Sequence, residues 1–337
     1  MNNQLIDVLL KIDFEDILGQ DFVKEQLKSA LVAGRNVILV GAPGIGKTTL
    51  AKNVAKLLPD IIVNDCPYHC SPDQPLCPQC RSNNSIKKIK IRGEQRFIRI
   101  QGSPDLTAED LIGDIDPVNA LKFGPQDMRS FTPGKIFKAN NKILFFDEVN
   151  RCSEKLQNAL LQALEEKKAT IASYDIDLPA DFIFIGTMNP GDISTEPLSD
   201  VFMDRFDLIY MKYPDNLETE KKIVRQKGKT ITKFPEILLS MTIKFVQELR
   251  QNPDLEKVPS VRASIGLYER AQSNALLRDK QKVSFKDIED AVFSVLTHRI
   301  KAKPSLKYLK KPEELIKEEL KRFKTENNIS DKESDLP

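Results

Sequence analysis

Eight consecutive residues near the amino terminus have the pattern of a loop that binds phosphate. They read Gly-x-x-x-x-Gly-Lys-Thr, and they are Gly41, Ala42, Pro43, Gly44, Ile45, Gly46, Lys47 and Thr48. Glycines let the backbone curl so that its N–H groups face a phosphate, while Lys47 adds charge and the Thr48 hydroxyl can bind Mg²⁺. We therefore expect this loop, with the adjacent Thr49, to bind a nucleoside triphosphate and Mg²⁺. The alternative is a glycine-rich turn that binds nothing.

Two acidic residues follow an apolar segment later in the chain. Asp147 and Glu148 come directly after Ile143–Phe146, which has the composition of a buried strand. Ligands of open α/β sheets bind at the carboxyl ends of the strands, so both acids should lie near the nucleotide. Asp147 would hold the hydration shell of Mg²⁺, and Glu148 would orient or deprotonate the attacking water. The alternative is a strand that simply ends in solvated acids.

A neutral amide follows the next predicted strand. Asn189 lies in the sequence Thr187-Met188-Asn189-Pro190, after the apolar segment Phe182–Gly186. At the same edge of the sheet as the two acids, its side chain could hydrogen-bond the γ-phosphate or the attacking water. Asparagine before proline is also a common turn residue, which is the alternative role.

Four of the five cysteines fall in one short segment with the spacing C-x₃-C-x₆-C-x₂-C. They are Cys66, Cys70, Cys77 and Cys80. In a reducing compartment such a group favours a metal over disulfides, and four thiolates suit tetrahedral Zn²⁺. His69 could replace one cysteine, and an iron–sulfur cluster or free structural thiols are the alternatives. We expect a structural or partner-docking role, because the cluster is far in sequence from the two acids.

The composition is that of a folded protein with room for two domains. The chain has 337 residues, of which 40% are hydrophobic, and its net charge is +2 from 51 basic and 49 acidic residues. This balance does not favour nucleic acid as a partner and does not exclude it. No segment resembles a secretory leader or approaches the ~20 apolar residues of a membrane span. We expect a cytoplasmic protein.

The hydrophobic pattern of the first 213 residues predicts an α/β domain. A helix is expected at Asp21–Ala33, a strand at Val37–Val40, and a second helix from the phosphate loop to about Leu58. Four more short apolar segments have the composition of buried parallel strands: Arg96–Ile100, Ile143–Phe146, Phe182–Gly186 and Leu208–Met211. Together they predict a doubly wound, five-stranded parallel sheet in residues 1–213.

The remainder of the chain predicts helices without strands. Residues 214–300 should form a small helical domain, with helices at Leu217–Gln226, Pro235–Leu249, Ser260–Leu277 and Ser284–Arg299. Residues 301–337 are rich in lysine and glutamate. There we expect one helix at Pro312–Phe323 and a flexible polar end.

The combined motifs resemble those of an AAA+ ATPase. The phosphate loop, the Phe-Asp-Glu strand, the Thr-Met-Asn-Pro strand and Asp204-Arg205-Phe206 each match a motif of that family. The resemblance implies a P-loop AAA+ fold with a small all-helical lid. It also implies that Arg205 is an arginine finger offered to a neighbouring subunit, which requires a ring, expected to be a hexamer. Without the resemblance, Arg205 would be a surface residue paired with Asp204 or Asp207.

Within this family, Arg262 in the segment Val258–Ala263 resembles the second sensor. Such an arginine lies at a helix start in the lid and couples the nucleotide state to the angle between domains. The alternative is a solvated arginine on a helix.

Further segments resemble the MoxR group and the ATPase subunit of magnesium chelatase. They are Leu106–Gly113, Phe131–Gly134, Asp147–Arg151 and Ala163–Glu166. The resemblance implies an insert within about residues 104–135, which interrupts the second helix around Ile112–Ser130, and a hairpin around Thr170–Pro179. In this group such inserts contact client proteins, and a protein with a von Willebrand factor A domain is the implied partner. The cysteine-rich segment 64–82 would be an additional insert.

Three functions agree with these motifs. The leading hypothesis is a ring-forming, Mg²⁺-dependent ATPase that remodels or activates a protein partner. A scaffold that assembles under nucleotide control is the second, and a DNA-dependent translocase is the third. The basic segment Lys87–Arg92 could contact phosphate in a translocase, although we interpret it as a solvated loop.

Overall fold

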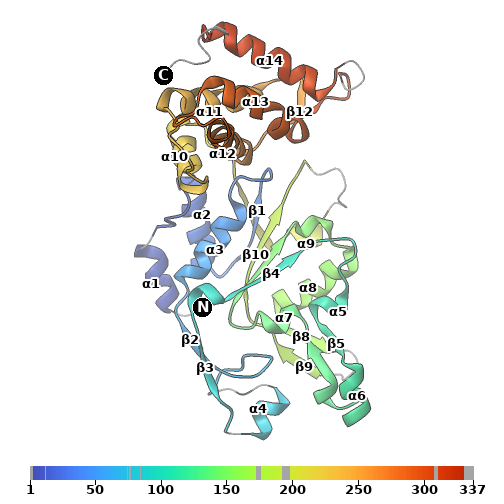
Figure 1. The fold of residues 1–337 in the computed structure, drawn as a ribbon. Coiled ribbons are helices and arrows are strands. Elements are labelled where there is room, and N and C mark those ends of the chain that lie inside the picture. The colour runs from blue at the N-terminus through green and yellow to red at the C-terminus, as the bar shows by residue number, and fades with distance from the viewer. Residues whose placement is uncertain are drawn as a thin grey trace. The chain divides into compact units, whose positions relative to one another are not determined.

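A computed structural model describes residues 3–11, 13–73, 75, 77–83, 85–171, 176–191, 198–306 and 310–329 (Figure 1). The chain divides into two compact units. The first comprises residues 1–42 and 46–211, and the second comprises residues 43–45 and 212–337. Each unit is described by itself.

The first unit is built on a five-stranded sheet in which neighbouring strands are parallel. The strand order is β11 (Phe206–Tyr210), β1 (Asn36–Val40), β10 (Ile183–Met188), β7 (Ile143–Asp147) and β4 (Phe97–Gln101). The predicted α/β fold with five parallel strands is therefore confirmed. Strand boundaries differ from the predicted ones by one or two residues, as expected where hydrogen bonding rather than hydrophobicity ends a strand.

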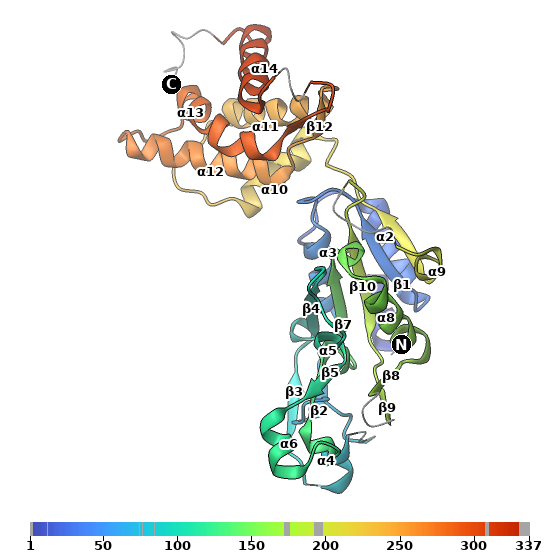
Figure 2. The ribbon, with the colours of Figure 1, turned by 90° about the vertical axis from the view of Figure 1, so that its right-hand side faces the viewer.

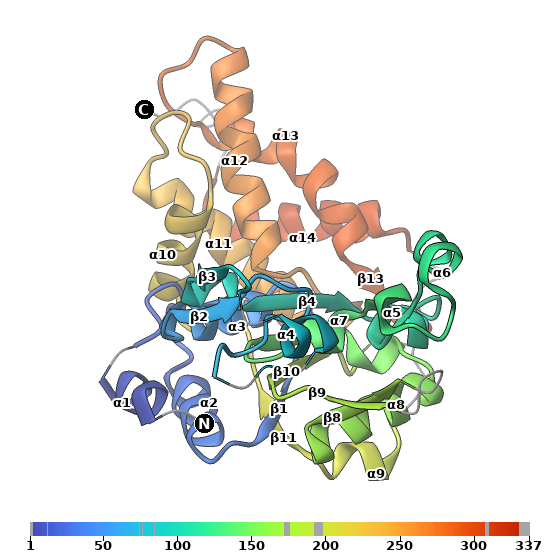
Figure 3. The same cartoon turned by 90° about the horizontal axis from the view of Figure 1, so that it is seen from below.

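Helices cover both faces of this sheet. Figure 3 shows α2 (Asp21–Val32) and α3 (Lys47–Leu57) on one side, and α7 (Lys135–Lys138), α8 (Glu154–Glu166) and α9 (Asp200–Met203) on the other. Helix α1 (Asn3–Lys11) precedes them and contacts α2 and α3. Because both faces are buried, the strands have continuous apolar sequences instead of alternating ones.

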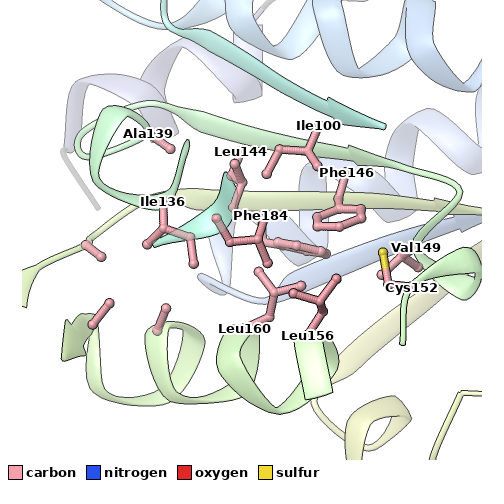
Figure 4. Close-up of a cluster of buried hydrophobic side chains, with 14 of the residues drawn as sticks. Ile100, Ile136, Ala139, Leu144, Phe146, Val149, Cys152, Leu156, Leu160 and Phe184 are labelled. Carbon is pink, nitrogen blue, oxygen red and sulfur yellow. The ribbon is translucent and has the colours of Figure 1, made fainter. Parts of the chain in front are cut away.

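A hydrophobic core lies between the sheet and α8. Phe146 of β7 and Phe184 of β10 are fully buried and face Leu156 and Leu160 of α8 (Figure 4). Full burial of side chains this large contributes about 1.5–3 kcal/mol each relative to exposure. This core holds the strand that ends in Asp147.

The cysteine-rich segment lies within an antiparallel hairpin. Strand β2 (Ile61–Asn64) pairs with β3 (Lys88–Ile91), and helix α4 (Pro78–Ser82) lies between them in sequence. Figures 1 and 2 show β2, β3 and α4 together at one end of the first unit. The interpretation of Lys87–Arg92 as a loop is wrong, because Lys88–Ile91 is a strand with the alternating pattern of a half-exposed ribbon.

A second insert separates two short helices. After α5 (Ala108–Leu111), strands β5 (Gly113–Ile115) and β6 (Phe131–Pro133) pair antiparallel and enclose helix α6 (Pro117–Phe123) before α7 begins. The predicted interruption of a helix around Ile112–Ser130 is thus observed. The predicted hairpin near Thr170–Pro179 is also present, as β8 (Lys168–Ile171) paired with β9 (Ile176–Pro179). Its tip at 172–175 lies outside the described residues.

In the residues that the structure describes, the second unit consists mainly of helices, with one short ribbon. Its helices are α10 (Leu217–Lys227), α11 (Glu236–Gln251), α12 (Val261–Leu277), α13 (Phe285–Leu296) and α14 (Pro312–Glu326). The expectation of a domain without strands needs a correction, because β12 (Leu255–Lys257) pairs with β13 (Lys301–Ala302). Strands this short carry no readable periodicity, so the sequence could not reveal them.

The carboxyl-terminal helix packs on the rest of this unit. Leu315, Ile316, Leu320 and Phe323 of α14 are buried in the same core as α11, α12 and α13. The predicted helix at Pro312–Phe323 is confirmed and continues to Glu326. The polar end predicted to be flexible, Thr325–Pro337, therefore begins within this helix, and from position 330 it lies outside the described residues. None of the helices that the structure describes is both long and apolar enough to cross a membrane.

Candidate nucleotide site and cysteine cluster

The predicted phosphate loop turns sharply between β1 and α3. Gly44 has φ 78° and Gly46 has φ 102°, a left-handed conformation that side chains other than glycine rarely adopt. The turn ends at Lys47, the first residue of α3, so the unbonded N–H groups of that helix start at the loop. Lys47 Nζ donates to the carbonyl oxygens of Gly41 (2.5 Å) and Ala42 (3.0 Å). These carbonyls hold the ammonium group beside the loop.

Thr187 at the end of β10 connects the two acids. Its hydroxyl donates to Asp147 Oδ1 (2.7 Å) and accepts from the backbone N–H of Glu148 (2.9 Å). The next residue, Met188, accepts from the N–H of Gly41 (3.0 Å), the first residue of the phosphate loop. A continuous series of hydrogen bonds therefore joins the loop, the end of β10 and the end of β7.

Asp147 and Glu148 each have a further partner from β4. Arg99 Nη2 donates to Asp147 Oδ2 (2.6 Å), and Gln101 Nε2 donates to Glu148 Oε2 (3.0 Å). Arg151 also pairs with Glu148, with 3.3 Å between Nε and Oε2. Glu148 itself has φ 56°, an uncommon conformation for a residue other than glycine. Its side chain is positioned by these partners and by a strained backbone.

No role was predicted for Arg99, Gln101, Thr187 or Arg151. Thr187 and Arg151 lie in the motifs Thr187–Pro190 and Asp147–Arg151, so their positions in the sequence were available as a signal. Arg99 and Gln101 approach the acids because β4 is the immediate neighbour of β7, with Gln101 paired to Asp147 in the register. Strand order is not visible in the sequence.

Asn189 lies beyond the end of β10 in a local turn. Its Oδ1 accepts from the N–H of Gly191 (3.3 Å), which is the geometry of an Asx turn. Its carbonyl oxygen lies 3.5 Å from Nδ2 of Asn150. The structure thus shows the turn contact, and contact with a nucleotide stays a prediction.

Arg205 follows α9 at the start of β11. Its guanidinium donates to Glu165 of α8 and to the carbonyl oxygen of Val201. Within the described part of the chain its ion-pair partner is Glu165, and neither Asp204 nor Asp207. The side chain is partly exposed, with 30% of its surface accessible.

Arg262 is the second residue of α12 and is exposed in the second unit. Burial lowers the pKa of Arg299 in that unit, and the charge of Arg262 lowers it further.

The four cysteines of the predicted metal site converge. The Sγ atoms of Cys66, Cys70, Cys77 and Cys80 all lie within 4.8 Å of one another, and all four residues are buried. Backbone N–H groups donate to three of the sulfurs, and Asn64 Nδ2 lies 3.5 Å from the fourth, Cys80 Sγ. The four are not joined by disulfides.

The chemistry of this cluster fits a metal cation. Tetrahedral Zn²⁺ with Zn–S bonds of about 2.3 Å places sulfurs about 3.8 Å apart, so 4.8 Å requires a small contraction. Burial raises the pKa of the Cys66 thiol to about 11, and the hydrogen bond with Cys70, followed by burial, raises that of Cys77. Without a cation these thiols would stay protonated, while a bound cation stabilises thiolates. N–H donors to sulfur stabilise the same charge.

The other cysteine, Cys152, is buried in the hydrophobic core beside α8 and outside this cluster.

Comparison with known families gives three matches along the chain. The family model described as "Magnesium chelatase, subunit ChlI" matches residues 13–68, and "ATPase family associated with various cellular activities (AAA)" matches residues 78–208. "AAA lid domain" matches residues 248–319. The matches include the phosphate loop, both acids and Arg205 in the first unit, and Arg262 in the second.

Two curated relatives carry related names. The magnesium-chelatase subunit ChlI homolog of Methanocaldococcus jannaschii is 28% identical, over 94% of this chain and 92% of that protein. The magnesium-chelatase 38 kDa subunit of Acidiphilium rubrum is 30% identical, over 64% of this chain and 62% of that protein.

Among solved structures, the RuvB Holliday junction branch migration motor of Thermotoga maritima is similar, with a TM-score of 0.50 and 16% identity. The match covers 86% of this chain and 74% of that chain. At this identity the likeness shows the fold alone.

Proposed function

The chain belongs to the AAA+ ATPases of the magnesium-chelatase ATPase-subunit type, and from this premise we propose that it hydrolyses ATP in a ring of identical subunits to remodel or activate a protein partner. The observation that carries the proposal is the series of hydrogen bonds from Gly41 through Met188 and Thr187 to Asp147 and Glu148. It supports the proposal because these bonds bring the loop that starts at Gly41 and the two acids to one edge of one sheet.

The residues at this edge fit ATP with Mg²⁺. The Thr48 hydroxyl and the Asp147 carboxylate are the oxygen ligands that a hard cation prefers, and Lys47 supplies charge for the phosphates. Asp147 Oδ2 is bonded to Arg99, so metal binding would exchange a guanidinium for a cation of higher charge. When bound, Mg²⁺ would neutralise charge that develops on the phosphates.

Glu148 has the chemistry of the residue that activates water. Its Oε2 accepts from Gln101, so its carboxylate is fixed in position, and exchanging this bond for a water would place a base at the nucleotide edge. Asn189 would then contact the γ-phosphate or that water after leaving its local turn with Gly191. We base the roles of Glu148 and Asn189 on their positions directly after the ends of β7 and β10.

Arg205 would complete the site of a neighbouring subunit. Its bond to Glu165 keeps the guanidinium at the surface next to α9, from which it could transfer to a phosphate in a ring, expected to be a hexamer. Such an arginine contributes about 10³–10⁵ in rate in related reactions. Arg262 at the start of α12 would report the nucleotide state to the second unit.

Mixing two inactive variants tests the ring and the site together. Arg205→Ala lacks the finger that a subunit gives to its neighbour, and Glu148→Gln lacks the base in its own site. Each variant alone should hydrolyse ATP at least about a hundredfold more slowly than the wild type. In a mixed ring, a site with Glu148 can receive Arg205 from its neighbour, so the mixture should recover a substantial part of the activity. No recovery from two folded, nucleotide-binding variants would contradict action in trans.

The partner would be a protein that contacts the inserts. Helix α6 exposes apolar side chains, with Leu121 90% and Val118 60% accessible, as expected of a surface that contacts another protein. A protein with a von Willebrand factor A domain is our proposed partner. The two relatives are named as magnesium-chelatase subunits, so insertion of a metal ion is the process that we propose ATP hydrolysis would drive together with such a partner. We place the protein in the cytoplasm, because four clustered free thiols suit a reducing compartment.

We also propose that the cysteine cluster holds a structural Zn²⁺. The four convergent sulfurs and their N–H donors support this assignment. The expected metal content is one zinc per chain by mass spectrometry of the purified protein. Cys77→Ser should lose it, whereas Cys152→Ser, a buried cysteine outside the cluster, should retain it. Iron with visible absorption, or no metal in the wild type, would overturn the assignment.

A further inference from the structure

A pocket of about 430 Å³ opens at the edge of the sheet opposite the nucleotide site. Four strand starts contribute to it: Asn36 begins β1, Ile183 begins β10, Lys142 directly precedes β7 and Arg96 directly precedes β4. Because the strands are parallel, this amino-terminal edge is separate from the carboxyl ends where Asp147 lies. Its volume is within the range of pockets that hold small ligands.

Two cations in the wall of this pocket are buried. Arg96 is 9% accessible and Lys142 is 5% accessible. Arg96 donates to backbone oxygens, those of Asn141 (2.9 and 2.5 Å) and Pro59 (2.7 Å), and Lys142 Nζ lies 3.1 Å from Nδ1 of His69. Across the described residues, neither cation has a carboxylate within ion-pairing distance.

Two other cations at this pocket differ from Arg96 and Lys142 in their exposure and in their ion pairs. Arg35 and Lys167 also line it, and both are about half exposed or more. Each has an acidic partner, Asp207 at 3.1 Å for Arg35 and Asp181 at 3.2 Å for Lys167. The cations that water can reach are paired, while the two that water barely reaches are not.

An unpaired buried cation is costly, so the arrangement favours a bound anion. Burial lowers the pKa of both groups. The charge of Asp60 partly offsets this at Arg96, while the charge of Arg96 lowers the pKa of Lys142 further. Arg96 uses three of its five N–H donors and Lys142 has three donors, so hydrogen-bonding capacity is left for a ligand. An anion that accepts these donors would relieve the repulsion between the two cations.

The rest of the wall is apolar and polar to a similar extent. The apolar residues Leu58, which follows α3, and Ile61, which begins β2, line the pocket. Leu164 of α8 and Phe182, which directly precedes β10, line it as well. A free inorganic ion would leave this surface exposed to water. An organic anion with an apolar body would cover it.

We propose that this pocket binds a small organic anion, whose carboxylate or phosphate group is held by Arg96 and Lys142 and whose apolar body packs on Leu58, Ile61 and Phe182. The residues that line this pocket are different from those proposed to bind ATP. Ser71 of the cysteine-rich segment also lines it, and His69 contacts Lys142, so a ligand there would adjoin the cysteine hairpin.

Calorimetric titration of the full-length protein tests the proposal. Saturating ADP and Mg²⁺ are present throughout, so that the phosphate loop is filled. The probes are hexanoate and phenyl phosphate, which distinguish a carboxylate from a phosphate ligand, and neutral hexanamide is the control. We expect at least one of the two anions to bind saturably at one per chain, and hexanamide to bind at least about tenfold more weakly. Absence of saturable binding by both anions would overturn the proposal.

Two matched variants locate the binding. Lys142→Met keeps an unbranched side chain one atom shorter and removes the buried charge, and should weaken binding of the anion at least about tenfold. Lys167→Met removes an exposed, paired charge from the same pocket and should change affinity less than about threefold. Equal affinities for Lys142→Met and the wild type would contradict the assignment.

Melting temperature gives a second readout. Without anion, the melting temperature of Lys142→Met should equal or exceed that of the wild type, because the substitution removes an uncompensated buried charge. Addition of the anion should raise the melting temperature of the wild type and leave that of Lys142→Met unchanged. A folded Lys142→Met that melts lower would show a structural role for the lysine and overturn the proposal. If this variant does not fold, Leu164→Trp provides the test. A tryptophan at this position should fill the apolar part of the pocket and abolish binding of the anion. Unchanged binding would contradict the proposed site.

Discussion

The two edges of the central sheet carry charges that are compensated in opposite ways, although β4 and β7 contribute to both. At the carboxyl edge, Arg99 of β4 pairs with Asp147 of β7 at 2.6 Å. At the amino edge, Arg96 and Lys142 precede the same two strands, are buried, and have no acidic partner among the described residues. An acid paired to a guanidinium can exchange it for a metal cation. Buried cations without acids are instead suited to an anion.

The largest effect should come from the acid at the carboxyl edge. Asp147→Asn keeps the shape of the side chain but removes the charge that would hold Mg²⁺, so kcat for ATP should fall at least about a hundredfold. A steady-state ATPase assay at saturating Mg²⁺ measures this. Asp60→Asn is the control, because Asp60 accepts from Gly93 and pairs with Lys90 at 3.0 Å without a role in the site. A similar loss in both variants would show a general effect on folding.

Stability should distinguish Arg96, which directly precedes β4, from Arg99 within β4. Arg96→Ala removes three charge-assisted hydrogen bonds to the carbonyls of Asn141 and Pro59, and should lower the free energy of unfolding by about 3 kcal/mol. Arg99→Ala removes an ion pair whose arginine is half exposed to water, and should cost less than about 1 kcal/mol. Urea unfolding of both variants makes the comparison. Equal losses would contradict the difference between the edges.

A smaller effect concerns the metal dependence. Arg99 donates to Asp147 Oδ2 and would compete there with Mg²⁺, so Arg99→Ala should lower the Mg²⁺ concentration for half-maximal hydrolysis by about threefold. Arg129→Ala is a matched control, because Arg129 pairs with Asp127 at the same 2.6 Å in the insert. A higher Mg²⁺ requirement in Arg99→Ala would instead show that the arginine helps to build the site.

The sequence predicted the parts of the site that follow the chain. The phosphate loop, Asp147 and Glu148 were recognisable because their spacing is local and their strands are continuous apolar segments. The same property identified five strands of the sheet. The sequence also showed the four cysteines, and the structure brings all four sulfurs together.

What the sequence did not predict depends on strand order and on pairing across long separations. Arg99 reaches Asp147 because β4 lies beside β7, and Arg96 and Lys142 share a pocket for the same reason. Strand β3 has an alternating pattern that was available at Lys88–Ile91, but its charge made a loop the simpler interpretation. The ribbon of β12 and β13 was too short to detect.

ATP turnover by Glu148→Gln tests the central claim, that the carboxyl edge is a hydrolytic ATPase site, most directly. The substitution keeps the hydrogen bond that Gln101 can make and removes the base. We expect hydrolysis to fall at least about a hundredfold while the Kd for ATP changes less than about threefold, so that ATP remains bound and uncleaved. Hydrolysis near the wild-type rate would contradict the role of Glu148 and the account of this edge.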